Sequence, residues 1–136
     1  MGYAMAKNVR RKMAPTGTLY IFDVFRHACE RFQNEFKEFG PVVIVDSPRE
    51  AAALSQTVIS IVPGPEEVQQ VYLNDISGII AAPKNQDRLI MECSTIDSQS
   101  SREIGEALRA ADAGTYIDTP VSVNFPKDTL LKDKLA

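Results

Sequence analysis

Residues 57–72 read TVISIVPGPEEVQQVY and contain the repeating unit of the chain. Residues 57–62 are β-branched or apolar except for one serine, which is typical of a strand buried on both faces. Pro63-Gly64-Pro65 ends that strand, and acidic residues at its exit favour the first turn of a helix, predicted over residues 66–73. A buried strand, a tight turn and a helix are the unit of parallel α/β sheets.

The same unit recurs along the rest of the chain. Residues 18–24, 42–45, 89–93 and 115–118 are predicted strands, and residues 4–13, 25–39, 48–54 and 98–111 are predicted helices. Ser47 before Pro48, with Glu50 three residues later, predicts a capped start for the 48–54 helix. The alternation predicts an α/β fold with a doubly wound parallel sheet.

The composition excludes several classes of partner. A chain of 136 residues, 44% of them hydrophobic, suits one globular domain. The formal net charge of -3, without a basic stripe, argues against nucleic acid. No apolar run reaches the ~20 residues that span a bilayer, so no membrane partner is expected. Residues 1–13 are basic and free of acidic residues, as in a mitochondrial presequence, but they lack its serines, and a first helix is the favoured interpretation.

Three residues of types that often carry chemistry are predicted to be structural here. Cys29 and Cys93 are far apart, with no histidine at metal-ligand spacing, and are expected to be buried free thiols. His27, the only histidine, falls on the exposed side of the helical pattern over residues 25–39. No paired carboxylates and no metal-ligand pattern emerge.

Ligands of a doubly wound sheet lie at the carboxyl ends of its strands. Asp23 ends one strand about 20 residues after Gly2, a spacing that suits a carboxylate on an adenosine ribose; the equal alternative is that it caps the next helix. The turn at residues 62–65 and the loop at residues 94–97 could bind a cofactor, or Ser94, Thr95 or Asp97 could only cap a helix. Ser122 could bind a substrate carboxylate or be a turn residue.

Six stretches follow one another from residue 1 to about residue 122: MGYAMAKNV, YIFDVFRHACERF, DSPREAA, TVISIVPGPEEVQQVY, ECSTID and DTPVS. Together they resemble the β-hydroxyacid dehydrogenase family, and its 3-hydroxyisobutyrate dehydrogenase branch most closely. The resemblance implies a Rossmann-type domain over residues 1–122, incomplete at its N-terminus, followed by a divergent tail over residues 123–136.

The resemblance also implies roles for particular residues. Gly2 matches the last glycine of a GLGNMG-type turn, and Asp23 matches the acidic residue that favours NAD over NADP. Val62 and Pro63 match a loop beside the nicotinamide, and Thr95 matches the threonine near the nicotinamide ribose. Ser122 matches the serine of a PVSGG substrate motif. Arg26, three residues after Asp23, is expected to point away from the cofactor.

Departures from the family pattern limit what the chain is expected to do. The first, central strand and the first two glycines of the turn are missing, and PVSGG becomes PVSVN. The region of the family's catalytic lysine is also missing, and the lysines of the tail are not assigned that role. No catalytic residue is therefore predicted, and the isolated chain is expected to be inactive.

The missing strand raises a question about the sheet. The strands over residues 18–24 and 57–62 would be its neighbours, and we expect them to pair directly with each other. An open gap would instead leave exposed strand edges, through which we expect the chain to aggregate.

Full-length relatives are expected to oxidise 3-hydroxyisobutyrate to methylmalonate semialdehyde with NAD in valine degradation, in mitochondria or otherwise in the cytoplasm, and to oligomerise through a C-terminal domain. The alternatives are a catalytically dead nucleotide-binding or interaction domain, or a fragment of another 3-hydroxyacid dehydrogenase, similar to tartronate semialdehyde reductase or 6-phosphogluconate dehydrogenase.

Overall fold

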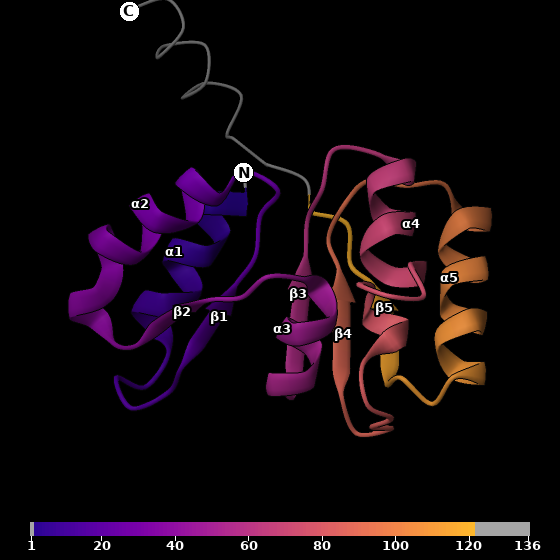
Figure 1. Cartoon of the computed structure of the whole chain (residues 1–136). Helices are drawn as coiled ribbons and strands as arrows, with labels where there is room; N and C mark the ends of the chain where they lie inside the picture. The colour runs from indigo at the N-terminus through magenta and orange to yellow at the C-terminus, as the bar shows by residue number, and fades with distance from the viewer. Residues whose placement is uncertain (1, 122–136) are drawn as a thin grey trace, which may run out of the picture.

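The predicted alternation of strands and helices is confirmed by the computed structural model, which describes residues 2–121 (Figure 1). In chain order the elements are α1 (Gly2–Lys12), β1 (Leu19–Ile21), α2 (Arg26–Phe36), the 3-10 helix η1 (Lys37–Phe39), β2 (Val42–Ile44), α3 (Pro48–Leu54), β3 (Thr57–Ser60), α4 (Pro65–Leu73), the 3-10 helix η2 (Ile79–Ala81), β4 (Leu89–Glu92), α5 (Ser98–Ala110) and β5 (Thr115–Asp118). The tail over residues 123–136 lies outside the described residues.

All the strand pairs that form are parallel, as the apolar strands predict. β1 pairs with β2, with Leu19 opposite Val42. β3, β4 and β5 form a second sheet in that order, with Thr57 opposite Leu89 and Leu89 opposite Thr115. Figure 1 shows the two groups of strands apart, with β3 the edge strand nearer to β1.

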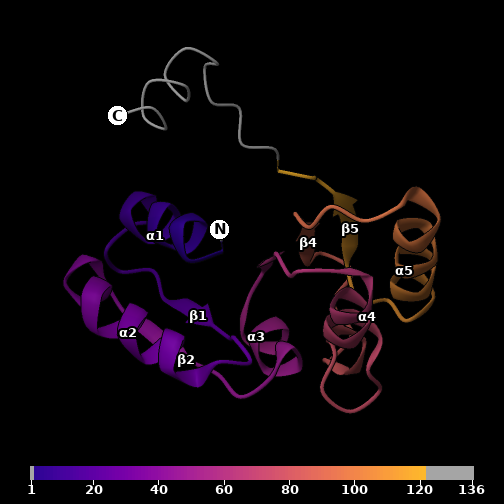
Figure 2. The ribbon, with the colours of Figure 1, turned by 90° about the horizontal axis from the view of Figure 1, so that it is seen from above.

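The expected pairing of β1 with β3 is wrong. Within residues 2–121 no ladder joins the two strands, and the sheet order stops at β3 on one side and at β1 on the other. α3 contacts both strands and lies between the β1–β2 pair and α4 when the molecule is seen from above (Figure 2). A helix with its side chains is about 10–12 Å across, more than twice the spacing of paired strands, so both strands can pack on α3 without meeting.

The open edges lead to an expectation about association. β1 and β3 each present backbone N–H and C=O groups that pair on one side only among the described residues. Because such edges template pairing with another chain, we expect the weight-average mass in sedimentation equilibrium to rise with protein concentration. The Ile59 side chain on β3 is 42% exposed, so Ile59→Lys places a charge on this strand and should reduce the rise in mass. A monomer at all concentrations would contradict this expectation.

Local chemistry explains where the helices begin. The Ser47 hydroxyl accepts a hydrogen bond from the Glu50 amide (3.1 Å), and the Glu50 carboxylate accepts one from the Asp46 amide (2.8 Å). The predicted cap of α3 is therefore confirmed. In α2, Cys29, Phe32 and Phe36 are buried as the helical spacing predicts.

Several helices and strands are shorter in the structure than the sequence predicts. Phe25 was expected to face inward on the 25–39 helix but is 74% exposed, because α2 begins one residue later. Val24, in the predicted 18–24 strand, is 81% exposed, because only Leu19–Ile21 have a strand partner in β2. Apolar character alone does not mark where a strand loses its partner.

The residues predicted to be structural behave as expected. His27 is 92% exposed. Cys29 and Cys93 are buried free thiols. Within residues 2–121 no helix is both long and apolar enough to cross a membrane.

Candidate functional site

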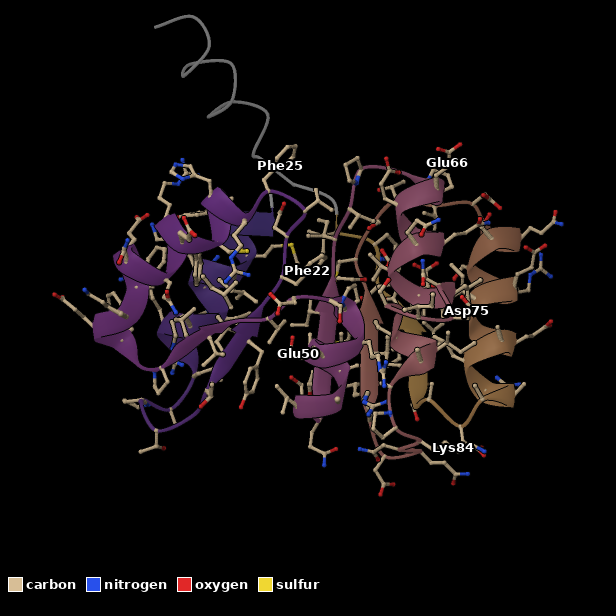
Figure 3. All side chains as sticks on the ribbon, viewed as in Figure 1. Phe22, Phe25, Glu50, Glu66, Asp75 and Lys84 are labelled. Carbon is tan, nitrogen blue, oxygen red and sulfur yellow. The ribbon has the colours of Figure 1, made fainter. Side chains whose placement is uncertain are left out.

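The carboxyl ends of the strands of both sheets lie at the same edge of the molecule. In Figure 3, Phe25, which follows β1, and Glu66, at the start of α4, lie at the top, whereas Lys84, which precedes β4, lies at the bottom. The loops that carry Asp23, Val62 and Thr95 follow β1, β3 and β4 and therefore share the top edge. Ligands of doubly wound sheets bind at this edge.

Asp23 lies in an open pocket of about 340 Å³ at the ends of β1 and β2. The lining consists of Phe22, Asp23, Val24, Arg26, Cys29, Ile44, Val45 and Asp46. One Asp23 oxygen accepts a hydrogen bond from the Phe25 amide (2.8 Å), which shapes the turn, but α2 has no side-chain cap. Asp23 is therefore not the N-cap of α2, and among the described residues no hydrogen bond involves its second oxygen.

Arg26 also lines this pocket, and the expectation that it points away is wrong. Its Nη1 lies 2.9 Å from the Asp46 carboxylate, and its Nε lies 3.9 Å from Glu30. Asp46 follows β2, so the ion pair connects the start of α2 to the end of β2. The Arg26 side chain is 58% exposed, so the ion pair adds little stability, but it places the guanidinium beside the pocket.

Cys29 also lines this pocket. The thiol is buried, and burial together with the charge of Asp23 raises the pKa of Cys29. A raised pKa keeps the sulfur protonated at neutral pH, so the thiol is not activated as a nucleophile. Its rate of alkylation can instead be used to detect a ligand in the pocket.

The loops after β3 and β4 are joined to each other. The Val62 amide donates to the Ser94 hydroxyl at 2.7 Å, which brings the 62–65 turn against the 94–97 loop. Pro63 and Thr95 are exposed beside this contact. Gly2 begins α1 next to the end of β3, where an added Cβ would lie 3.1 Å from the Ile61 side chain. A glycine therefore permits a close approach of α1 to this edge.

The joined loops rest on a buried polar network that sequence reasoning missed. Glu92 is fully buried, and its carboxylate accepts hydrogen bonds from the Ser60 hydroxyl (2.5 Å) and the Ser94 amide (2.6 Å). The Ser60 hydroxyl is also 2.5 Å from the buried Tyr72 hydroxyl. The signal was present in the sequence, since Glu92 is the one carboxylate in an otherwise apolar strand and a buried carboxylate needs partners.

Asp97 has the structural role that was one of its two interpretations. Its carboxylate accepts a hydrogen bond from the Ser100 amide (2.8 Å) and caps α5. The Ser100 amide and hydroxyl lower the pKa of Asp97. Thr95, by contrast, is not needed to cap α5.

Within residues 2–121 no three or more histidine, cysteine, aspartate or glutamate side chains gather as metal ligands. Ser122, the predicted substrate residue, lies outside the described residues, as do Lys127, Lys132 and Lys134.

Parallel strands, helices between them, and an acidic residue after β1 define a dinucleotide-binding α/β domain of the Rossmann type. Residues 1–124 match the model of the NAD binding domain of 6-phosphogluconate dehydrogenase, and the chain belongs to that family.

The curated relatives that the chain matches include 3-hydroxyisobutyrate dehydrogenases. The mitochondrial 3-hydroxyisobutyrate dehydrogenase of Homo sapiens is 31% identical over 122 residues, which cover 90% of this chain and 33% of the relative. The 3-hydroxyisobutyrate dehydrogenase of Pseudomonas aeruginosa is 35% identical over 77 residues, 57% of this chain and 25% of the relative. The chain thus spans at most about a third of the length of these curated relatives.

Solved structures agree with the fold. The Mycobacterium tuberculosis 3-hydroxyisobutyrate dehydrogenase structure with L-serine has a TM-score of 0.66 at 27% identity, covering 91% of this chain and 38% of that one. The Salmonella typhimurium 3-hydroxyisobutyrate dehydrogenase has a TM-score of 0.67 at 24% identity, covering 90% and 38%. The similarity of the chain to the N-terminal NAD-binding domain of 3-hydroxyisobutyrate dehydrogenases is therefore seen in both sequence and fold.

Proposed function

We propose that the chain is the NAD(H)-binding domain, over residues 1–122, of a 3-hydroxyisobutyrate-dehydrogenase-like oxidoreductase. The observation that carries the proposal is the position of Asp23 in a pocket at the carboxyl end of β1, with one carboxylate oxygen free of hydrogen bonds from the described residues. A carboxylate there can accept hydrogen bonds from the hydroxyls of an adenosine ribose.

The remaining residues divide between the parts of the cofactor. Gly2, which brings backbone close to the end of β3, would allow the pyrophosphate to approach α1. Val62, Pro63 and Thr95, on the joined loops, would lie beside the nicotinamide and its ribose. When bound, the nicotinamide supplies hydride transfer, and this chain's residues hold and orient it.

The charges around the pocket support NAD(H) over NADP(H). A 2′-phosphate near Asp23 would meet that carboxylate and Asp46, and the nearest cation, Arg26, already pairs with Asp46 and Glu30. Calorimetric titration of the chain with NADH and NADPH tests this preference, and Asp23→Asn should reduce it. Tighter binding of NADPH by the unaltered chain would contradict it.

Catalysis by this chain alone is not expected. None of the residues proposed to lie beside the nicotinamide, Val62, Pro63 and Thr95, is a lysine or a histidine, and loss of a positioned acid–base group costs ~10²–10⁴ in rate. We therefore expect no NADH formation from NAD and 3-hydroxyisobutyrate above a heat-inactivated control. A measurable rate would refute this part of the proposal.

The whole protein would oxidise a 3-hydroxy acid, with Ser122 on the substrate carboxylate and assembly through a further domain. A mitochondrial location is supported by the name of the human relative, whereas another relative is bacterial. The family match supports a second candidate substrate, 6-phosphogluconate. Assaying both acids with the whole protein separates the candidates, and binding of NADH without turnover of either would favour a catalytically inactive domain.

A further inference from the structure

The buried network under the joined loops has a defined direction of hydrogen bonding. Ser60 has one hydroxyl proton, and it is donated to Glu92, so the Tyr72 hydroxyl must donate to Ser60. Burial, with the charge of Glu92, raises the pKa of Tyr72 and keeps that donor protonated. The Ser94 amide is the second donor to Glu92. Glu92 is therefore the final acceptor of a chain that starts in α4.

Ser94 connects the Glu92 carboxylate to both loops. Its amide is held by Glu92 at 2.6 Å, while its hydroxyl receives the Val62 amide at 2.7 Å. Two loops from different strands are thus fixed by one buried side chain, and each carries residues proposed to contact the nicotinamide end of the cofactor. Such buried, connected polar groups hold one geometry because each broken bond leaves an unpaired group.

We propose that Glu92 is a positioning residue that sets the geometry of the 62–65 and 94–97 loops for binding the nicotinamide end of the cofactor. The inference rests on the proposed function. Glu92 touches no exposed surface and acts only through Ser94 and Ser60.

The chemistry of the network predicts the effect of two substitutions. Ser94→Ala removes the acceptor of the Val62 amide and leaves the Glu92 contact to the backbone intact. Glu92→Gln keeps the size of the side chain but adds N–H donors next to Ser60. The buried network of Ser60, Tyr72 and residue 92 then contains more hydrogen-bond donors than acceptors. Both variants should loosen the Val62 amide.

Ser101→Ala is the matched control. Ser101 in α5 is also buried, and its hydroxyl lies 3.1 Å from a tyrosine hydroxyl, that of Tyr116. Only the Ser101 amide bonds to the 94–97 loop, at the Asp97 carbonyl, and Ser101→Ala keeps that backbone bond. Ser101→Ala therefore removes a buried serine hydroxyl, as Ser94→Ala does, from the part of the molecule that contains β3, β4 and β5.

The test combines amide hydrogen exchange with titrations of the full chain by NADH and by AMP, which lacks the nicotinamide end. In Ser94→Ala and Glu92→Gln we expect Val62 exchange and the Kd for NADH to rise about tenfold, the worth of one hydrogen bond. The Kd for AMP should stay unchanged, and Ser101→Ala should change none of the three.

The outcomes separate this inference from the proposed function. If Val62 exchange in Glu92→Gln matches that in Ser101→Ala, or if the affinities for AMP and NADH fall together, the positioning role of Glu92 is wrong. If the unaltered chain does not bind NADH, the proposed function fails, and Val62 exchange still decides whether Glu92 sets the loops. Should Glu92→Gln not fold, Ser60→Ala replaces it in the same measurements, because it removes the other donor that holds the Glu92 carboxylate.

Discussion

The β1–β2 region and the β3–β5 region are built from the same strand–helix unit but differ in how much they bury. The first has a core cluster of three buried residues, Phe32, Phe36 and Val42, which pack with Tyr3 of α1. The second has nine, with Ile90, Ile104 and Leu108 at most 1% exposed. Because stability follows buried apolar area, the second region should be the more stable.

The two regions also share a device at the edge opposite the candidate site. In each, a buried arginine binds backbone carbonyls of the loops that lead into the strands: Arg10 those of Ala14, Gly17 and Pro41, and Arg88 those of Pro83 and Ala113.

A glycine with positive φ stands beside each arginine. Gly40 has φ 143°, and an added Cβ would lie 2.6 Å from the Arg10 guanidinium. Gly114 has φ 144°, and an added Cβ would lie 2.4 Å from the Arg88 carbonyl oxygen. One edge of the molecule is thus fixed by structural residues, and the other carries the exposed polar residues of the candidate site.

The largest expected effect is the loss of stability when a core side chain is truncated, and it should differ between the two regions. Phe36→Ala removes one of three core residues and should unfold the first region, while Leu108→Ala should lower the free energy of unfolding of the second by about 2–5 kcal/mol. Native-state hydrogen exchange measures both regions in one sample. Loss of β4 protection in Phe36→Ala would show that the regions unfold as one unit.

A smaller effect is expected from the arginines. Arg10→Met and Arg88→Met each leave buried or half-buried carbonyls without a donor, at about 1–3 kcal/mol. Arg10→Met should raise amide exchange in β1 and β2, and Arg88→Met in β4 and β5, because the hydrogen bonds lie within those regions. Equal effects of either variant on both regions would contradict this local role.

The smallest effect concerns Cys29, studied in a Cys93→Ser background. Its raised pKa means that the thiolate forms at higher pH than in a free cysteine, so alkylation near pH 8 should be slow and should accelerate as pH rises. Asp23→Asn removes a charge that raises this pKa and should increase the rate severalfold. AMP should slow alkylation if it fills the pocket that Cys29 lines; an unchanged rate at saturating AMP would count against that pocket.

Periodicity and residue type predict the elements and the cap at Ser47, because these depend on neighbours along the chain. The parallel pairing follows from continuously apolar strands that alternate with helices. The separation of β1 from β3 could not be predicted in this way, since it depends on how α3 packs against both strands. For the same reason the orientation predicted for the Arg26 side chain was wrong, because its partner, Asp46, lies 20 residues away in the sequence.

The candidate site shows the same division. Asp23, Val62 and Thr95 are candidates because strand ends are visible in the sequence, and in the structure each follows the carboxyl end of a strand. The Ser60–Tyr72–Glu92 network was not, because its members are up to 32 residues apart and meet only in the folded core.

The most direct test of the division of the cofactor between the two regions is a pair of ¹H–¹⁵N NMR titrations of the full chain, one with AMP and one with NADH. AMP should shift the amide signals of Asp23, Arg26 and Cys29 and leave those of Val62 and Thr95 in place. NADH should shift both sets. Shifts at Val62 and Thr95 with AMP, or no shift at Asp23 with NADH, would contradict the assignment of the adenosine end to the first region and the nicotinamide end to the second.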